Sequence, residues 1–272
     1  MSSTDTFRDA DPGSEPGSGP GSEPGSAPGS EPGSGSGSGS DPRDLSPQYV
    51  LPLVVRVEKD APPAHTDALE AAGRAVLALL TDDRTTREDG EWRAAVEAWE
   101  DARIRKVVRR ARGAEWRRAA ALPGLTVTGS AQVNPAEVRV YPPIPLDGWP
   151  KELSKLQVSG TELDDPAAPA PPEPGTPVLW LSPEVAMSTG KAMAQAGHAA
   201  QLAWWALPDP ERERWAADGF PLAVRTPGRA LWSRLLASGL PVVRDAGFTE
   251  IAPGSATVVA DHPGLAAHHR GG

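Results

Sequence analysis

The chain has 272 residues, a net charge of −9 and no cysteine. The lack of cysteine excludes disulfide bonds and thiolate metal sites, and it fits a reducing compartment. No apolar run reaches membrane-spanning length, and the N-terminus lacks the apolar segment of a secretory signal. We therefore expect a cytoplasmic protein that does not cross or bind a membrane.

The first 46 residues have the composition of a flexible tail. Residues 11–40 contain ten Gly, nine Ser and six Pro, so 25 of these 30 positions cannot build a core. Residues 1–44 also carry a net charge of −6, which leaves −3 for the remainder. We expect a disordered, solubilising extension over 1–46, and the acidity of the chain says little about ligands of the folded part.

A second break separates two modules. Six prolines crowd into a short stretch, at positions 166, 169, 171, 172, 174 and 177. Such a run predicts a semi-rigid, extended linker over 164–176. It divides an N-terminal module, 47–163, from a C-terminal module, 177–264, and we expect residues 265–272 to form a disordered C-terminus.

Strands alternate with helices along the N-terminal module. The apolar pattern predicts strand, helix, strand, helix and two closing strands, in the order Val50–Val57, Asp67–Leu80, Arg103–Arg109, Gly113–Ala121, Val127 and Val138–Tyr141. Alternation of this kind is typical of a layered α/β fold.

The C-terminal module repeats this rhythm. Its expected elements are a strand, a helix capped by Ser188 or Thr189, a strand, a helix and two strands, in the order Val178–Ser182, Ser188–Leu207, Pro221–Arg225, Gly228–Ser238, Val242–Arg244 and Ala256–Asp261. Three short matches accompany the shared order, namely 72–75 with 196–199, 112–116 with 228–232, and 136–138 with 256–258. Together they suggest an internal duplication, in which the N-terminal module is a degenerate copy.

The first candidate site lies on the helix that follows the strand at 178–182. A phosphate-binding P-loop would need Gly at position 185 and Ser or Thr at position 192, but the chain has Val185 and Ala192. That motif is therefore rejected. Lys191, Gln195 and His198 are spaced i, i+4 and i+7, so they share one helix face. For His198 alone, a packed helix histidine is the simpler interpretation.

The second candidate site is the loop after the strand at 242–244. Asp245 ends that strand and enters a loop rich in Gly, Pro and hydroxyl residues. In α/β sheets the ligand crevice lies where strand ends meet helix N-termini, which would bring Asp245 beside Lys191. Read alone, the loop is equally typical of a surface turn capped by an Asp.

Taken together, the two segments resemble the peptidyl-tRNA hydrolase family of the archaeal and eukaryotic type. The family pattern Met-Gly-Lys-Gly-Lys-x-x-Ala-Gln-x-x-His-Ala is matched here by MSTGKAMAQAGHA at 187–199. The pattern Asp-Ala-Gly-x-Thr-x-Ile-x-Pro-Gly-Thr-x-Thr is matched by DAGFTEIAPGSAT at 245–257. The resemblance covers residues 177–264. Thr189 replaces the first family lysine, Ser255 replaces a threonine, and the family's small apolar turn after the last strand becomes Asp261-His262-Pro263.

The resemblance implies a mixed four-stranded sheet covered by helices in three layers, present twice if the duplication holds. It implies hydrolysis of the ester between a peptide and the terminal ribose of tRNA, without cofactor or metal. Asp245 would orient water, Lys191 would stabilise the oxyanion, and the hydroxyls of Thr249 and Thr257 would place water or substrate. Gln195, His198 and Gly247 would support substrate binding. We expect His262, His268 and His269 to lie on a disordered terminus rather than in a metal site.

A tRNA partner requires contacts to phosphates. Arg225 and Arg244 are candidates beside Lys191, together with Arg229 and Arg234. The stretch from Arg103 to Arg118 holds eight basic residues against one acid, Glu115. It predicts either a grip on the tRNA backbone or an ordinary solvated face. Asp67 aligns with Lys191 in the N-terminal copy, and nothing there reproduces the loop at 245–249.

Two alternatives stay open at this point. The first is a non-catalytic protein of the same fold that binds tRNA ends or a protein partner. The second is the oligomeric state. The chain either forms a homodimer or mimics a homodimer with its two modules.

Overall fold

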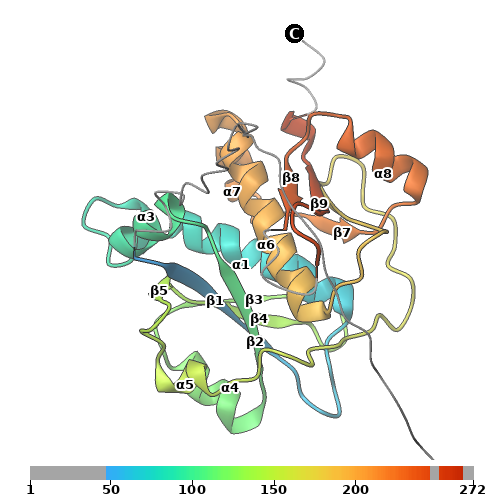
Figure 1. Ribbon diagram of the computed structural model, residues 1–272. Coiled ribbons are helices and arrows are strands. Elements are labelled where there is room, and N and C mark those ends of the chain that lie inside the picture. The colour runs from blue at the N-terminus through green and yellow to red at the C-terminus, as the bar shows by residue number, and fades with distance from the viewer. Residues whose placement is uncertain (1–46, 246–250, 266–272) are drawn as a thin grey trace, which may run out of the picture. The chain divides into compact units, whose positions relative to one another are not determined.

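The computed structural model describes residues 47–245 and 251–265 (Figure 1). The predicted tail over 1–46 lies outside the described residues. Gly247 and Thr249 of the predicted site also lie outside them, as do residues 266–272 of the predicted C-terminal tail.

The first sheet is built from the N-terminal half of the chain. Its order is β2-β1-β4-β3, and β5 pairs with the first residues of β1, ahead of the part of β1 that pairs with β4. The first two strands are parallel, whereas β1–β4, β3–β4 and β1–β5 are antiparallel. The strands are β1 (Tyr49–Arg56), β2 (Lys106–Ala111), β3 (Leu125–Thr128), β4 (Glu137–Val140) and β5 (Ile144–Pro145).

Five helices accompany this sheet. The longest packs on β3 and β4, and the others lie in the connections between strands. They are α1 (His65–Thr81), α2 (Asp83–Thr86), α3 (Arg93–Asp101), α4 (Gly113–Ala120) and α5 (Lys151–Ser154).

The second sheet has four strands in the order β7-β6-β9-β8. β6 and β7 are parallel, whereas β6–β9 and β8–β9 are antiparallel. The elements are β6 (Val178–Leu181), α6 (Thr189–Ala206), α7 (Asp209–Ala217), β7 (Ala223–Arg225), α8 (Arg229–Leu236), β8 (Val242–Arg244) and β9 (Ala256–Asp261).

The two sheets share one topology, with β1, β2, β3 and β4 standing where β6, β7, β8 and β9 stand. The registers agree as well, since Val55 pairs with Val138 in one sheet and Leu181 pairs with Val258 in the other. The predicted α/β class with mixed sheets is confirmed. The first sheet differs from the expected four strands by β5, and the helices α2, α3, α5 and α7 were not predicted from the sequence.

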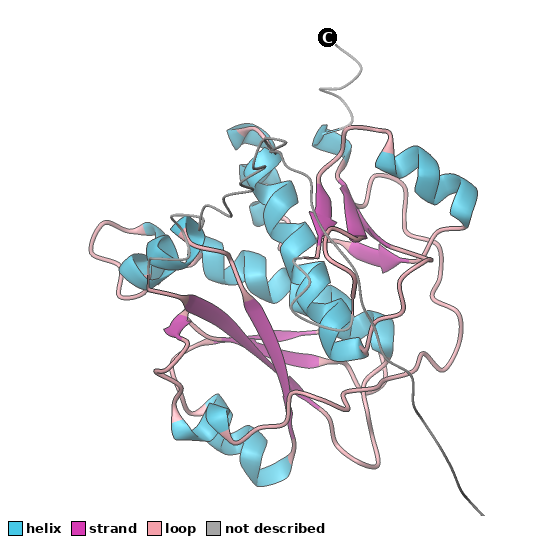
Figure 2. Cartoon of the chain, viewed as in Figure 1, coloured by secondary structure: helices cyan, strands magenta, loops and turns pink. Residues whose placement is uncertain are grey.

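Helices α1 and α6 lie next to each other between the sheets, with α4 and α5 on the far side of the first sheet (Figure 2). Glycines allow the close approach. A β-carbon at Gly73 would lie 3.2 Å from the Leu222 side chain, and one at Gly197 would lie 2.9 Å from the Val76 side chain. Apolar side chains of both sheets and both helices form one continuous buried core.

None of the helices within 47–245 and 251–265 combines the length and apolar character needed to cross a membrane.

Candidate functional site

Lys191 lies in the first turn of α6, and the local sequence fixes its place. Ser188 caps the helix, and its hydroxyl accepts a hydrogen bond from the backbone N–H of Lys191 at 3.3 Å. A serine cap satisfies one of the N–H groups that a helix start leaves without a partner. The Lys191 side chain is 16% exposed, so its ammonium group is held near the surface but not in bulk water.

Asp245 follows β8, at the start of the loop that leads to β9. Its backbone N–H donates to the Ser255 carbonyl at 2.9 Å, and its carbonyl accepts from the Gly254 N–H at 2.7 Å. These two bonds close the base of the loop. The Asp245 carboxylate is buried, and the Lys191 ammonium donates a hydrogen bond to its Oδ2. The structure therefore brings together the two charged groups that the sequence singled out.

Two further side chains fix the Asp245 carboxylate, one directly and one indirectly. Gln195 lies one turn after Lys191, and its Nε2 donates to the same Asp245 oxygen at 2.9 Å. The Thr257 hydroxyl lies 2.9 Å from Gln195 Oε1 and 3.2 Å from the Val243 carbonyl. Gln195 is 3% exposed and Thr257 is fully buried. Thr257 thus reaches Asp245 through Gln195, and both are placed to fix the carboxylate.

This arrangement offers a donor and an acceptor at one point. A lysine ammonium carries three donors, and a carboxylate only accepts. The pair can therefore hold a water molecule or hydroxyl on the carboxylate and stabilise negative charge near the ammonium. Charge-assisted hydrogen bonds of this kind are shorter and stronger than neutral ones.

His198 is not directed at this pair. Its Nδ1 lies 3.3 Å from Lys106 Nζ of β2, at the junction of the two halves of the chain. Burial lowers the pKa of His198 well below its usual range, and the positive charges of Lys106 and Lys191 lower it further. The packed-histidine interpretation describes this placement better than substrate binding does.

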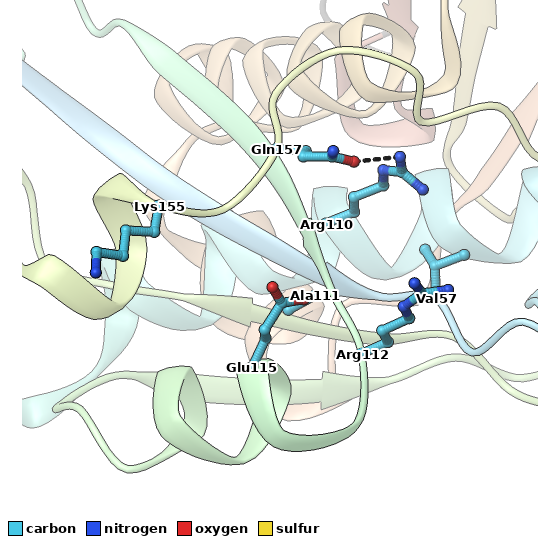
Figure 3. A pocket seen from close by; sticks show the side chains of 7 residues that line it. All are labelled: Val57, Arg110, Ala111, Arg112, Glu115, Lys155 and Gln157. Atoms are coloured by element: carbon cyan, nitrogen blue, oxygen red, sulfur yellow. Dashed lines mark hydrogen bonds between the residues drawn. The ribbon is translucent and has the colours of Figure 1, made fainter.

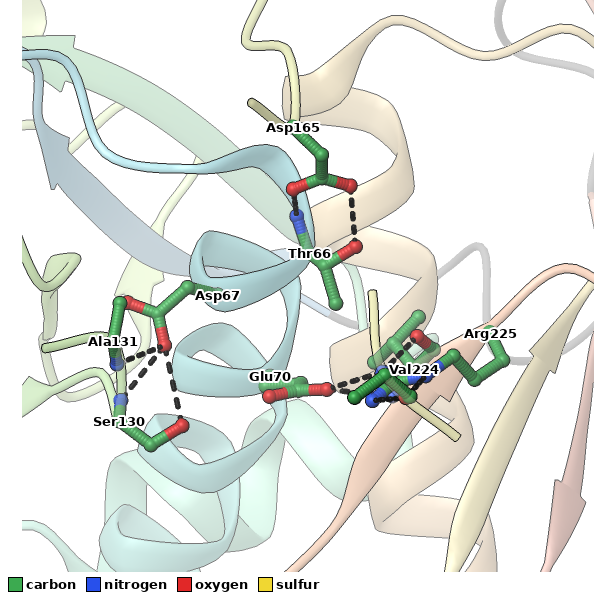
Figure 4. Close-up of polar contacts among 9 residues, drawn as sticks. Thr66, Asp67, Glu70, Ser130, Ala131, Asp165, Val224 and Arg225 are labelled. Carbon is green, nitrogen blue, oxygen red and sulfur yellow. Dashed lines mark hydrogen bonds and ion pairs between the residues drawn. The ribbon is translucent and has the colours of Figure 1, made fainter. Parts of the chain in front are cut away.

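The two arginines expected beside Lys191 lie in different surroundings. Arg225 donates to Glu70 of α1 at 2.7 Å and to the Ala170 carbonyl of the linker at 2.8 Å, so its guanidinium is bound within the protein (Figure 4). Arg244 is exposed and lies 3.3 Å from the Gly254 carbonyl, next to Asp245 in the chain.

Thr189, at the position of the first family lysine, has a structural explanation. It is 2% exposed, and its hydroxyl oxygen lies 3.0 Å from His65 Nδ1 of α1. The same oxygen accepts from the Leu163 N–H at 2.9 Å. Thr189 therefore joins the starts of α6 and α1 to the segment before the linker, and a lysine at this position would be buried among these groups.

The linker itself is anchored by the start of α1. Asp165 accepts from both the backbone N–H and the hydroxyl of Thr66, at 2.8 and 2.6 Å (Figure 4). This carboxylate satisfies donors at a helix start that Ala64 cannot cap. The extended segment after 163 is thereby tied to both halves of the chain.

The N-terminal half has a counterpart of the site with reversed charge. Asp67 of α1 stands where Lys191 stands in α6, and it is 6% exposed. Its carboxylate accepts from the backbone N–H groups of Ser130 at 2.7 Å and Ala131 at 3.1 Å (Figure 4). It also accepts from the Ala136 N–H at 2.7 Å. These groups belong to the connection between β3 and β4, which corresponds to the loop carrying Asp245. The carboxylate fills the space there, since a β-carbon at Gly129 would meet it at 1.9 Å.

A buried polar cluster between the halves was not anticipated from the sequence. Lys106 is 8% exposed, and its ammonium donates to Gln201 Oε1 at 2.6 Å. Gln201 in turn lies 3.3 Å from Glu100 Oε1. Burial lowers the pKa of Lys106 and raises that of Glu100, because each loses its hydration. Lys106 had been counted in the basic stretch 103–118, but neither predicted role, RNA grip or solvated face, applies to it.

The expectation for His262 was wrong. Its side chain is 7% exposed, and its ring packs edge-on against Trp215 of α7 with centroids 4.7 Å apart. Its Nδ1 accepts from the Gly264 N–H at 3.0 Å. The helix α7 was not predicted, so the sequence offered no partner for this histidine. His268 and His269 lie outside the described residues.

Within the described parts of the chain, no three His, Asp or Glu side chains are grouped so that they could hold a metal ion. In comparisons with known proteins, residues 177–268 match the family model described as Peptidyl-tRNA hydrolase PTH2. This segment contains α6 and the loop after β8, and hence the whole Lys191–Asp245 pair. A search of curated proteins found no match.

Proposed function

We propose that the C-terminal half of the chain hydrolyses the ester bond between peptide and tRNA in peptidyl-tRNA, in the cytoplasm, and so recycles the tRNA. The observation that carries the proposal is the contact between Lys191 and Asp245 within the segment that matches the family model. Neither residue type is unusual alone. Their convergence from distant points of the chain supports a site for an acyl ester.

In the proposed reaction, Asp245 orients a water molecule and accepts one of its protons as the water oxygen attacks the ester carbonyl carbon. The carbonyl oxygen becomes negatively charged, and the Lys191 ammonium stabilises it. The bond between the carbonyl carbon and the ribose oxygen then breaks. The ribose oxygen takes the proton back from Asp245, which leaves a free tRNA hydroxyl, a peptide carboxylic acid that ionises in water, and Asp245 again as a carboxylate. The step needs no cofactor and no metal.

We assign the surrounding residues different parts in this reaction. Gln195 and Thr257 are positioning residues, because Gln195 holds the Asp245 carboxylate and Thr257 holds Gln195. Thr249 and Gly247 keep their expected roles at the loop, with Thr249 placing water or substrate through its hydroxyl. Arg244, exposed beside Asp245, is a candidate for a phosphate near the ester.

We further propose that the two halves arose by duplication and that the N-terminal half is a non-catalytic companion. The shared strand order and register support this, as does the replacement of the lysine position by Asp67. The packing of α1 against α6 would then stand in for a contact between two subunits, so a homodimer would not be needed to complete the fold.

Turnover of a peptidyl-tRNA by the purified full-length chain tests the proposal. Release of free tRNA that is lost in Asp245→Asn supports hydrolysis. Tight binding of the same tRNA without any release would instead favour the non-catalytic alternative, a module that binds tRNA ends.

A further inference from the structure

A basic hollow lies at the end of β2, beside the start of α4. It occupies about 390 Å³ and contains Arg110, Arg112 and Lys155 together with Glu115 and Gln157 (Figure 3). A second hollow of about 330 Å³ shares Glu115 and Lys155 with it and adds Arg118, Lys151 and Glu152. We call the two together the basic groove. It runs between α4 and α5.

The groove carries more positive than negative charge. Five cations line it, Arg110, Arg112, Arg118, Lys151 and Lys155, against the two acids Glu115 and Glu152. Across the described residues, none of these five cations forms an ion pair within the protein. Concave surfaces that gather one sign of charge attract ligands of the other sign.

The walls of the groove are held in place by hydrogen bonds. Arg110 donates from its backbone to the Gln157 carbonyl at 3.0 Å and from its guanidinium to the Gln157 side chain (Figure 3). Arg109 points to the other face of β2, where it donates to the Leu156 carbonyl at 2.6 Å and stacks over Trp149. Arg109 is therefore structural, and Arg110 and Arg112 form the ligand-facing row. At the start of α4, the Gly113 N–H already donates to the Glu58 carboxylate. The positive charge of the groove therefore comes from its side chains and not from the helix N-terminus.

The other half of the molecule lacks the two groove cations at the end of β2, although Arg234 stands where Arg118 stands. Its strand register pairs Leu179 with Val224, as the first sheet pairs Leu53 with Val108, which places Thr226 where Arg110 stands and Gly228 where Arg112 stands. The equivalent of Arg109 is Arg225, which binds Glu70. Arg110 and Arg112 thus occur only in the half without the lysine–carboxylate pair, and the shared fold alone does not require them.

A short segment links the groove to the Lys191 site. Gln157 lies in the groove, and Thr161 packs against Gly190, where a β-carbon would lie 3.6 Å from it. Four residues of extended chain cover at most about 14 Å. Gln157 of the groove therefore lies a short distance from Thr161, which contacts the start of α6.

We infer that the basic groove binds backbone phosphates of the RNA substrate, at a point set back from the ester. This inference rests on the proposed function for the identity of the RNA. Arg110, Arg112 and Lys155 supply the contacts, since guanidinium and ammonium groups are the usual partners of phosphate oxygens. The N-terminal half would then add affinity, while the chemistry stays at Lys191 and Asp245.

The test uses the full-length chain with Arg110→Gln, Arg112→Gln and Lys155→Gln combined. The control combines Arg87→Gln, Arg93→Gln and Arg214→Gln, which removes the same charge from solvent-accessible sites elsewhere. Binding of deacylated tRNA is measured against salt for both variants, and thermal unfolding checks that each is folded. We expect the groove variant to bind at least about tenfold more weakly at low salt, with a salt slope reduced by roughly two to three, while the control stays near wild type.

Two further readouts separate this inference from the proposed function. Turnover of a peptidyl-adenosine ester, which lacks the RNA arm, should be the same in the groove variant and the wild type. If the wild type does not turn this ester over either, that result counts against the proposed hydrolysis and not against the groove. Inorganic phosphate is titrated as well, because a free phosphate ion presents the same oxygens to the groove as the RNA backbone does. Unchanged tRNA affinity and salt slope in a folded groove variant would overturn the inference, and saturable binding of free phosphate in the groove together with unchanged tRNA affinity would overturn it in favour of a small anion.

Discussion

His65 and Thr189 open the helices α1 and α6, and their side chains meet, with the imidazole Nδ1 3.0 Å from the hydroxyl oxygen. Equivalent positions of the two halves thus face each other. The Leu163 N–H donates to the same hydroxyl oxygen, so three segments converge on one threonine. The residue that departs from the family pattern belongs to the contact between the halves rather than to the Lys191–Asp245 pair.

Replacing Thr189 with the family lysine should therefore weaken the fold. The change buries an ammonium group and removes the acceptor of the Leu163 N–H, and such losses cost on the order of 2–4 kcal/mol. Thr189→Ser keeps the oxygen and should stay near wild type. Urea denaturation of both variants gives the comparison. Equal stability of the lysine variant and wild type would show that the site tolerates a cation and that the contact carries little energy.

The Asp67 carboxylate should matter for stability and not for catalysis. Asp67→Ala leaves three N–H groups without their acceptor, of which that of Ala136 is buried, and we expect the free energy of unfolding to fall by roughly 2 kcal/mol. The exposed Asp60→Ala should change it little. Turnover per folded molecule should stay near wild type. If turnover falls instead while stability holds, the N-terminal half takes part in the reaction.

Thr257 should act on the reaction only through Gln195 and Asp245. Thr257→Val removes the hydroxyl donor to the Gln195 amide, and we expect kcat to fall roughly tenfold with KM unchanged, equal to about 1.4 kcal/mol. Thr257→Ser should restore the hydroxyl and most of the rate. A rise in KM at constant kcat would mean that this threonine contacts the substrate itself.

His262 should make stability sensitive to acid. Burial lowers its pKa below the usual value of 6.5, so the folded state binds its proton less readily than the unfolded state does. Stability is then fully present above about pH 6.5 and falls as the pH drops below it. His262→Asn keeps an acceptor for the Gly264 N–H but cannot titrate. Between pH 7.5 and 5.5 the wild type should lose more of its unfolding free energy than this variant, by urea denaturation at each pH. Equal losses would show that His262 binds its proton as readily in the folded state as in the unfolded state.

The strands and the two long helices could be predicted because their apolar patterns are long and bounded by clear signals. Ser188 marks the start of α6 and Pro208 follows its end, and the helix runs from 189 to 206. Helix α3 was missed, although its face with Val96 and Trp99 is buried, because it has only nine residues and these are its only two large apolar side chains. The short helices α2 and α5 have four residues each, too few for a periodic pattern.

The site was predicted best where distant charges pair and worst where the halves meet. Lys191 and Asp245 could be placed together from the rule for strand ends. The placements of Lys106, Arg225 and Thr189 depend on partners from the other half of the chain, respectively Gln201, Glu70 and His65. No local pattern indicates such contacts, because they arise from how α1 and α6 pack.

The most direct test measures kcat for peptidyl-tRNA hydrolysis by wild type, Lys191→Met and Asp245→Asn, with Lys59→Met and Asp218→Asn as controls at exposed positions. Circular dichroism and thermal unfolding establish that each variant is folded. We predict that both site variants lose at least about 100-fold in kcat, since each removes a group that acts only in the transition state, while both controls stay near wild type. Wild-type turnover by a folded Asp245→Asn or Lys191→Met protein would contradict the account.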